Sequence, residues 1–398
     1  MKITFHFNRL QGILNIFCLI LIAACIVISP ACGDENTSVA SVSADHVSAE
    51  YATGFHVEYR DGYKIVTVTN PWRGSNDSFT YVLVPEGTNP PELQKNEKII
   101  SIPVKRFVAL SSTYLAYLPI LGVTDSLVGV KGTDIVSTPE VRSMIEEGKV
   151  IDVSGGGAGM GSDVNLETLL DLSPDLVMTY ATGQAEYDTH PKLEEAGIPV
   201  ALNGEYMEQD PLGRAEWIKY VSVFFNKEKE ANEYFETIKN QYNSLKKSAA
   251  SENNPKPTVF LNNNYQGTWF MAGGDSFVAK YLNDAGAEYL WANDTTTGSI
   301  PLDFEVVYDT ALNADFWLNP GTANSIKELM SQDARYFDFK AMKSKKVYNS
   351  NARVNANGGN DYWESGVVHP EIVLKDLVKI FHPNLVPDHT LYYYKHLE

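Results

Sequence analysis

Two short segments, far apart in the chain, place a carboxylate at the same point of a predicted helix. Asn165-Leu166-Glu167 and Asp303-Phe304-Glu305 each put Asn or Asp at an N-cap position and glutamate two residues later, in the first helical turn. Taken singly, either glutamate is explained by structure, because a carboxylate there complements the helix dipole. The matched spacing in the two halves of the chain favours a paired role for Glu167 and Glu305.

Aromatic and cationic side chains gather in the loops that follow predicted strands. Tyrosine and tryptophan offer broad apolar faces with polar tips, which suit a flat or bulky ligand. For a single aromatic residue, core or rim packing is the more frequent explanation. The run 355–363 is the most persuasive loop, because it is too rich in Gly and Asn for a core and too aromatic for a linker. The ligand-binding candidates are Ser112, Tyr114, Lys131, Tyr180, Tyr206, Tyr265, Trp269, Trp291, Arg353, Tyr362 and Trp363, with Lys131 and Arg353 as the cations expected near an anionic ligand.

The chain offers no evident catalytic or bare-metal site. A zinc or manganese ion would need clustered His and carboxylates, whereas the eight histidines are scattered, and three of them (His190, His369 and His382) precede a proline. Ser111-Ser112 lacks a nucleophile-elbow context, and the glycine run 155–161 lacks the ending of a phosphate-binding loop. The sequence therefore predicts a protein that is not an enzyme, without catalytic residues, bound metal ion or cofactor.

Alternating short strands and helices are expected to position these residues. From residue 104 onward, apolar strands such as 107–110 and 176–178 alternate with helices such as 165–172, which is typical of a parallel sheet covered on both faces. Residues 211–249 carry a helical stripe without a strand pattern. The predicted fold class is therefore α/β, with two Rossmann-like lobes joined by a long helix. Ligands of such sheets lie outside the carboxyl ends of the strands, so a site in the cleft between the lobes is expected.

A strand-rich segment precedes the first lobe. Two alternating runs flank Asp61-Gly62, a hairpin signal, which predicts a small antiparallel β addition at the N-terminus. Packing is the default explanation for this addition and for the aromatic C-terminal residues 392–396. The predicted parts are a signal peptide at 1–32, a flexible tether at 33–50, the β-rich addition at 51–103, an N-terminal α/β lobe at 104–210, a helical inter-lobe segment at 211–252 and a C-terminal α/β lobe at 253–398.

All three cysteines lie in the first 32 residues, which resemble an export signal. A basic start, the apolar run 16–28 and a polar exit fit such a signal, and the run is short for a membrane span. Cys25 follows a sequence similar to the bacterial lipobox, whereas Cys32 leads into a more suitable polar tether, so both stay open as the lipidated residue. A cleaved signal without lipid and a retained anchor helix are the alternatives. We expect an extracytoplasmic protein, lipid-anchored to the bacterial cell membrane or periplasmic.

The charge of the chain excludes some partners. The 32 basic and 50 acidic residues give a net charge of −18, and removal of residues 1–32, with two basic and no acidic residues, leaves 30 − 50 = −20. Such an acidic protein is a poor match for nucleic acid and for direct adhesion to anionic lipid. No cysteine remains after residue 32, so no disulfide can form and the hydrophobic core must hold the fold.

Over residues 104–383 the chain resembles the substrate-binding proteins of ABC importers for iron-siderophore complexes, haem and cobalamin. The resemblance implies that Glu167 and Glu305 dock into arginine pockets on the two subunits of an ABC permease dimer, which works with its ATPase. It also implies a ferric siderophore as the ligand, with haem and cobalamin open. A surface interaction or sensory protein on the same bilobal scaffold is the alternative. The resemblance rests on residues 104–112, on Leu121-Gly122-Val123 before Leu127-Val128-Gly129-Val130, on Asn165-Leu166-Glu167 before Pro174-Asp175-Leu176-Val177, and on Phe304-Glu305.

Overall fold

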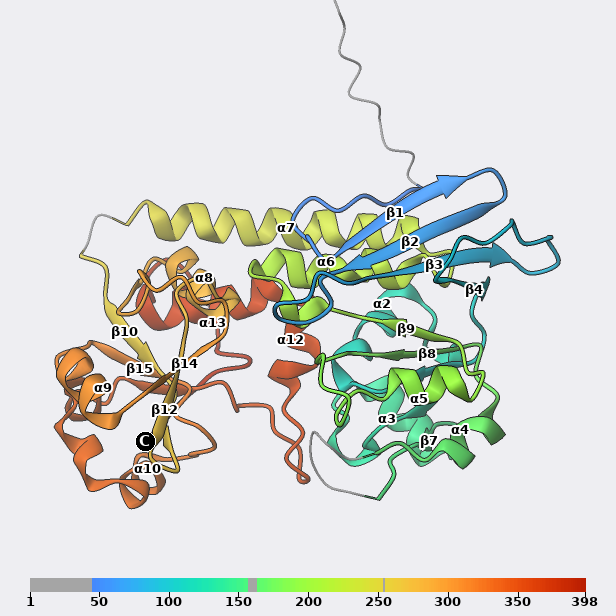
Figure 1. The fold of residues 1–398 in the computed structure, drawn as a ribbon. Coiled ribbons are helices and arrows are strands. Elements are labelled where there is room, and N and C mark those ends of the chain that lie inside the picture. Colours follow the sequence, from blue (N-terminus) through green and yellow to red (C-terminus); the bar gives the residue numbers. More distant parts are fainter. Residues whose placement is uncertain (1–44, 157–162, 253–254) are drawn as a thin grey trace, which may run out of the picture. The chain divides into compact units, whose positions relative to one another are not determined.

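Two five-stranded sheets, one in each half of the chain, carry the fold (Figure 1). The computed structural model describes residues 45–156, 163–252 and 255–398, and the compact unit to which they belong is Val42–Glu398. The predicted signal peptide, Cys25, Cys32 and most of the predicted tether lie outside the described residues. Within the described ranges, no helix combines the length and apolar character needed to cross a membrane.

The N-terminal addition is a four-stranded sheet in the order β1-β2-β3-β4. Asp61-Gly62 forms the predicted hairpin turn, and Gly62 adopts a φ of 84°, a conformation that glycine reaches without strain. The first three strands are antiparallel as expected, but β4 pairs parallel with β3, a direction that an alternating pattern cannot reveal. The strands are β1 (Phe55–Arg60), β2 (Tyr63–Thr69), β3 (Ser78–Pro85) and β4 (Glu97–Ile102).

The first lobe contains a parallel sheet in the order β7-β6-β5-β8-β9. Residues 112–121 form a 3-10 turn followed by a short helix, which ends where Gly122 turns left-handed at a φ of 67°. The strands are β5 (Phe107–Ala109), β6 (Leu127–Val130), β7 (Ile151–Asp152), β8 (Leu176–Thr179) and β9 (Val200–Leu202), and the helices are η1 (Ser112–Tyr114), α2 (Tyr117–Leu121), η2 (Thr124–Ser126), η3 (Thr133–Ile135), α3 (Pro139–Glu146), α4 (Leu166–Leu172), α5 (His190–Glu195) and η4 (Glu205–Met207).

The second lobe repeats this plan with the order β13-β10-β15-β16-β17, in which only β17 is antiparallel. A separate antiparallel sheet, β11-β12-β14, accompanies it. The strands are β10 (Thr258–Leu261), β11 (Asn264–Tyr265), β12 (Thr268–Ala272), β13 (Glu288–Tyr289), β14 (Ser299–Leu302), β15 (Phe316–Leu318), β16 (Val347–Asn349) and β17 (Lys395–His396), and the helices are α8 (Phe277–Asp284), α9 (Phe304–Ala311), α10 (Ile326–Gln332), η5 (Ala334–Asp338), α11 (Lys340–Lys343), η6 (Asp361–Trp363), α12 (Ser365–Val368) and α13 (Pro370–Phe381).

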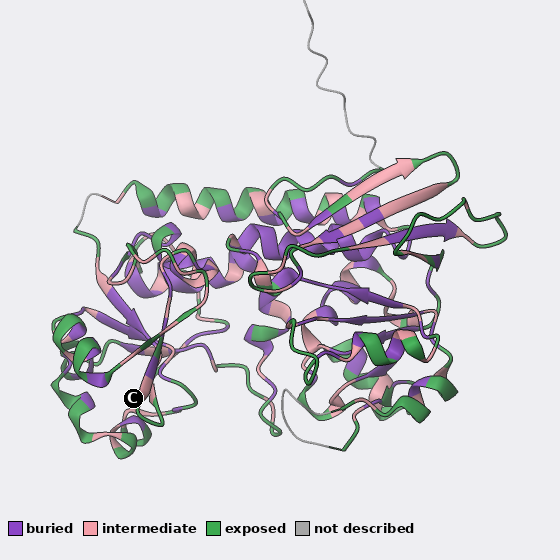
Figure 2. Cartoon of the chain, in the orientation of Figure 1, coloured by how far each residue is buried: buried purple, intermediate pink, exposed green. Residues whose placement is uncertain are grey.

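The predicted α/β class with two lobes is confirmed, but the helical segment between them contains two helices. These are α6 (Pro211–Ser222) and α7 (Glu228–Ala250), which pack together. Every residue of α6 is buried, whereas α7 shows the amphipathic pattern expected from the sequence (Figure 2). The apolar stripe of α7 packs against α6 and α13, and its charged side faces solvent, as is typical of an amphipathic surface helix.

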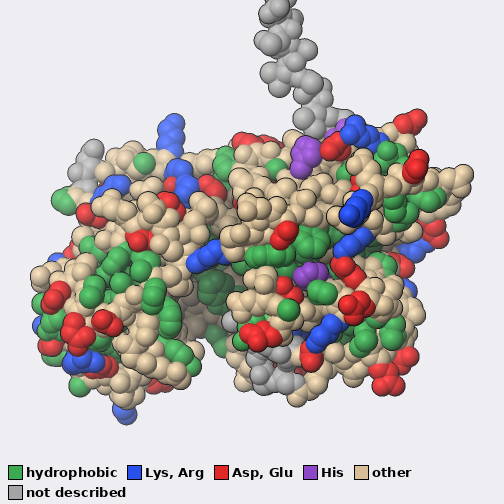
Figure 3. All heavy atoms as spheres, in the orientation of Figure 1, with side chains coloured by type: hydrophobic (Ala, Val, Ile, Leu, Met, Phe, Trp, Pro, Cys, Tyr) green, Lys and Arg blue, Asp and Glu red, His purple; other side chains and the backbone are tan. Residues whose placement is uncertain are grey.

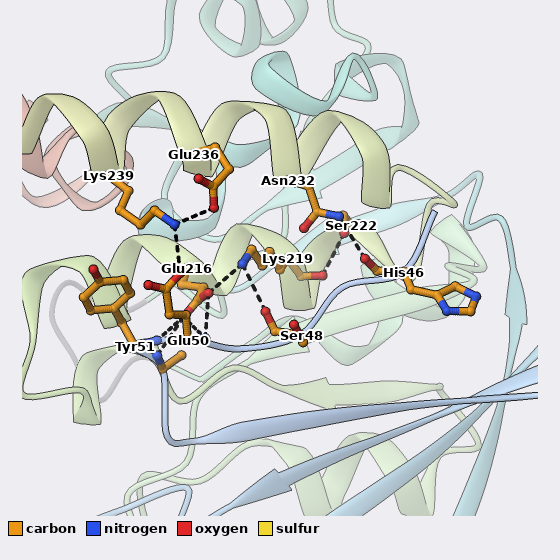
Figure 4. A network of polar contacts seen from close by, with 11 residues as sticks. His46, Ser48, Glu50, Tyr51, Glu216, Lys219, Ser222, Asn232, Glu236 and Lys239 are labelled. Atoms are coloured by element: carbon orange, nitrogen blue, oxygen red, sulfur yellow. Dashed lines mark hydrogen bonds and ion pairs between the residues drawn. The ribbon is translucent and has the colours of Figure 1, made fainter. Parts of the chain in front are cut away.

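Buried carboxylates fasten the N-terminal segment to α6 (Figure 4). Glu216 is fully buried and accepts hydrogen bonds from the backbone amides of Glu50 (2.9 Å), Tyr51 (2.7 Å) and Ala52 (2.8 Å). Lys219 lies 2.6 Å from the other oxygen of Glu216. A buried carboxylate is tolerated only when it is paired and hydrogen-bonded, and these contacts meet that requirement.

The C-terminal residues are fastened in the same way. Asp376 of α13 is fully buried and accepts hydrogen bonds from the amides of Tyr392, Tyr393 and Tyr394. His389 lies 2.6 Å from the same carboxylate. The aromatic C-terminal run, for which the sequence suggested packing, therefore packs on the second lobe. It also positions β17, which pairs with β16 at the edge of the sheet.

We predict that Glu216→Ala destabilises the protein strongly. The variant leaves Lys219 buried without its carboxylate and the amides of residues 50–52 without their acceptor. The expected loss is about 3–5 kcal/mol in the free energy of unfolding, measured by urea denaturation. Glu236→Ala, which removes a half-exposed glutamate of α7 paired with Lys239, is the matched control and should cost less than about 1 kcal/mol. Equal losses in the two variants would refute this role of Glu216.

A second prediction concerns His190, which packs edge-on against Phe79 of β3 and is only 8% exposed. Burial lowers the pKa of this imidazole below its ordinary value of 6.5. As the pH falls, the unfolded chain therefore takes up the proton first, so the stability present above about pH 6.5 is lost as the pH drops toward the folded pKa. Urea denaturation between about pH 8 and about pH 5 should show a steeper loss for the wild type than for His190→Gln. Parallel losses would contradict this assignment.

Candidate functional site

A pocket of about 700 Å³ lies at the carboxyl ends of the second-lobe strands. Asn262 follows β10, Asn319 follows β15, and Asn349 closes β16, so three neighbouring strands each deliver an asparagine to this edge. Asn262 and Asn319 turn the chain with left-handed φ values of 62° and 57°, which asparagine tolerates better than most residues. The pocket therefore occupies the position expected for a ligand in a parallel sheet.

The described residues that line the pocket are mostly of polar types, and none of them is charged. Asparagine, serine and threonine predominate, and Phe277, Tyr362 and Trp363 add aromatic surface. Asn349 is almost fully buried and donates to the carbonyls of Gly321 and Ala323 (2.9 Å each), which fixes the loop after β15. The remaining polar lining residues are Asn262, Ser276, Thr297, Ser299, Asn319, Thr322, Asn324, Ser350, Asn351 and Asn360.

Of the second-lobe candidates, two line the pocket, and the others lie in the core or elsewhere on the lobe. Tyr362 and Trp363 line the pocket, and Trp363 is 49% exposed. Trp269 is fully buried in an aromatic core, where its indole donates to the carbonyl of Leu261 at 2.8 Å, so core packing accounts for it. Tyr265 is exposed on the β11–β12 hairpin and Trp291 is partly buried against the core, and neither lines this pocket.

Arg353 was expected to stand near an anionic ligand, but its guanidinium is already engaged. Its Nε donates to Asp361 at 2.6 Å, and its Cζ lies 4.2 Å from the ring centre of Tyr392. Both contacts lie within the loop 351–363 or against the C-terminal residues. The cation therefore stabilises that loop, and it does not line the pocket.

The first-lobe candidates Ser112, Lys131 and Tyr180 lie just after strands β5, β6 and β8, at one edge of the parallel sheet. Lys131 is half-buried, and burial lowers the pKa of its ammonium group. Tyr180 is also half-buried, and its pKa is raised by burial. The sheet thus brings these three residues to the edge where a ligand is expected.

Two further tyrosines of this lobe have structural contacts. Tyr114 is 2% exposed, and burial raises the pKa of its phenol well above the ordinary value. Tyr206 is 39% exposed, and its hydroxyl lies 2.6 Å from the carbonyl oxygen of Ala181 and 3.1 Å from that of Pro71. Burial raises the pKa of Tyr206 to about 12. Tyr114 is thus a core residue, whereas Tyr206 ties the N-terminal addition to the first lobe.

Contacts between the lobes are concentrated on Glu364 and Asn355. The carboxylate of Glu364 accepts from the amides of Ser137 (2.9 Å) and Thr138 (2.6 Å), and burial raises its pKa although these bonds oppose the shift. Asn355 donates to the carbonyl of Asp134 at 3.0 Å. The loop after β16 is therefore attached to the loop after β6, and this attachment limits how far the lobes can separate.

Glu167 and Glu305 occupy equivalent places on α4 and α9. Both are exposed in the first helical turn, and each has an exposed apolar neighbour, Leu166 (38%) and Val306 (47%). Asn165 accepts the capping hydrogen bond from Thr168, whereas the Asp303 side chain makes none. Glu305 lies 3.6 Å from Arg335, a long contact between exposed groups that contributes little.

Asn319, Asn324 and Asn349 of the pocket wall were missed by sequence reasoning, whereas Asn360 belongs to the predicted run 355–363. The signal for such residues was the position of Asn262, Asn319 and Asn349 at the ends of three strands. Asparagine there is usually taken for turn formation, which two of these residues do perform. Within the described part of the chain, no three His, Cys, Asp or Glu side chains are grouped so that they could hold a metal ion.

Comparison with known proteins relates the chain to binding proteins. Residues 107–354, more than half of the chain, match the model of a family described as periplasmic binding protein. An uncharacterized lipoprotein of Methanocaldococcus jannaschii is 29% identical over 84% of this chain and 81% of its own length. The N-terminal addition precedes the range that the family model matches.

Solved structures share the fold. A possible iron-binding (periplasmic solute-binding) protein from Staphylococcus epidermidis superposes with a TM-score of 0.54 and 18% identity, over 70% of this chain and 99% of that one. A periplasmic heme binding protein from Pseudomonas aeruginosa gives a TM-score of 0.52 and 18% identity, over 70% and 93%. At these identities the likeness concerns the fold alone.

Proposed function

Because the chain belongs to the periplasmic binding protein family, we propose that it is an extracytoplasmic lipoprotein that captures a metal chelate and delivers it to an ABC importer. A ferric siderophore is the proposed ligand, and haem and cobalamin are the other chelates of this class. The observation that carries the proposal is the pocket at the carboxyl ends of β10, β15 and β16. Lipid attachment at Cys32 or Cys25 would hold the protein at the membrane.

The chemistry of the pocket suits a chelate better than a bare ion. Its volume of about 700 Å³ falls in the range of small-molecule sites. Amide and hydroxyl groups can hydrogen-bond the polar periphery of a chelate, while Trp363 offers it an apolar face. The side-chain oxygen of Asn351 is buried and accepts no hydrogen bond within the described residues, so a ligand donor could satisfy it.

The proposed partner is a permease dimer with its ATPase, which Glu167 and Glu305 would engage, one from each lobe. Exposed carboxylates are suited to arginine-lined pockets, because guanidinium and carboxylate pair through two parallel hydrogen bonds. The exposed Leu166 and Val306 add apolar surface beside each acid. On the face drawn in Figure 3, basic side chains are scattered among acidic ones without a large positive patch, which agrees with a partner other than nucleic acid.

Ligand binding is tested by calorimetric titration with the ferric complexes of a tris-catecholate and a tris-hydroxamate siderophore, with haemin and with cyanocobalamin. We predict that at least one chelate binds and that Trp363→Ala weakens it up to about tenfold, because an aromatic contact is lost. Tyr265→Ala, which removes an exposed aromatic of the same lobe outside the pocket, is the matched control and should leave affinity unchanged. Failure of all four chelates to bind would refute the proposed function.

Docking is tested by reversing the charge of both acids in the double variant Glu167→Lys/Glu305→Lys. We predict unchanged chelate affinity and loss of chelate uptake by cells that depend on this protein, because repulsion replaces attraction at both permease subunits. Glu140→Lys/Glu288→Lys reverses one exposed glutamate on each lobe elsewhere and should leave uptake intact. Normal uptake in the first variant, or equal loss in both, would overturn the docking assignment.

A further inference from the structure

The loop between β2 and β3 of the N-terminal addition reaches the rim of the second-lobe pocket. Gly298, which lines that pocket, faces the guanidinium of Arg73 so closely that a Cβ on Gly298 would overlap it. The three nearest atoms to that position all belong to this guanidinium group. A residue of the addition thus touches the proposed binding site from outside both lobes.

The residues before Arg73 hold the loop on the first lobe. The Tyr206 hydroxyl lies within hydrogen-bonding distance of the Pro71 carbonyl, as described above. The Trp72 indole lies directly over Gly183, where a Cβ would collide with it, and its ring meets Phe79 edge-on at 6.1 Å. Because Pro71 and Trp72 are fixed, the backbone that carries Arg73 is fixed at the rim as well.

Among the residues that the structure describes, the charge of Arg73 has no partner. Arg73 is exposed, and among the described residues it forms neither an ion pair nor a hydrogen bond. Arg353, the cation that the sequence suggested for this role, is neutralised by Asp361. None of the residues that line the pocket is charged. A guanidinium with free donors beside a neutral pocket is chemically suited to an oxyanion of the bound ligand.

We propose that Arg73 recognises an anionic oxygen group of the chelate in the second-lobe pocket, so that the N-terminal addition is part of the binding site. This inference rests on the proposed function. A planar guanidinium binds two oxygens of a carboxylate or catecholate at once, which an ammonium group cannot match. The site therefore selects chelates that carry negative charge over neutral chelates of similar size.

The test measures the affinity of the full-length protein for the same four chelates by calorimetry. The ferric tris-catecholate and haemin carry net negative charge on oxygen groups, whereas the ferric tris-hydroxamate is the uncharged probe. Cyanocobalamin is neutral overall but carries a phosphodiester anion, so it does not serve as an uncharged control. Arg73→Gln should weaken the bound anionic chelate by about tenfold or more, because charge-assisted hydrogen bonds are lost. The same variant should leave binding of an uncharged chelate unchanged.

Three further variants separate recognition from structure. Arg73→Lys should recover only part of the lost affinity, since the planar fork is missing. Gly298→Ala should reproduce the effect of Arg73→Gln, because the new Cβ displaces the guanidinium. Arg60→Gln removes another exposed arginine of the addition, one that is paired with Glu58, and should change nothing.

The outcomes distinguish this inference from the function on which it rests. If the wild type binds no chelate, the proposed function fails and the role of Arg73 falls with it. If the wild type binds an anionic chelate but Arg73→Gln binds it equally well, only the role of Arg73 is refuted. Binding of uncharged chelates alone by the wild type, or an equal loss for charged and uncharged chelates, would refute that role as well.

Discussion

The complete burial of α6 is the constraint on which the rest of the structure depends. This helix carries Arg214, Glu216 and Lys219 into the protein interior, where each buried charge requires a partner. Glu216 pairs with Lys219 and accepts hydrogen bonds from amides of the N-terminal segment. The guanidinium of Arg214 lies 2.6 Å from a carboxylate oxygen of Glu205. The partners of these charges come from distant parts of the chain, so α6 contacts and positions several segments at once.

Arg214 of α6 contacts residues of both lobes. Its Glu205 partner belongs to the first lobe, while its Cζ lies 4.3 Å from the ring centre of Phe277 in the second lobe. Burial opposes the charge on Arg214, but Glu205 more than offsets it, so the pKa of the guanidinium is raised. Phe277 also lines the second-lobe pocket. The pocket wall is therefore connected to a rigid helix, and small lobe movements are expected to accompany ligand binding.

Much of the architecture could be predicted because it follows from local periodicity. The alternation of short apolar strands with amphipathic helices identified two α/β lobes, and the helical stripe through Phe235 and Ile238 identified α7. The two glutamates proposed for docking were found as a repeated pattern, and both lie exposed in first helical turns. The fully buried α6 has no polar face, so its separation from α7 could not be derived from periodicity.

The ligand candidates were harder to predict, because the same aromatic residue serves equally well in a core or in a pocket. Trp269 and Trp363 are both tryptophans in the second lobe, yet one is fully buried and the other is 49% exposed at the pocket. Arg353 and Arg73 differ in the same way, since within the described part of the chain only the first has a carboxylate partner. No pattern within a few residues distinguishes these cases.

The sequence by itself determined the type and order of the elements, the acidic charge and the repeated glutamates, because each of these depends on neighbouring residues. Only the tertiary structure decided which strand-end residues form the pocket wall, which arginine has no ion-pair partner among the described residues, and that the N-terminal addition touches the second lobe. These features arise from contacts between residues far apart in the chain, such as Arg73 and Gly298, and such contacts depend on how the elements pack.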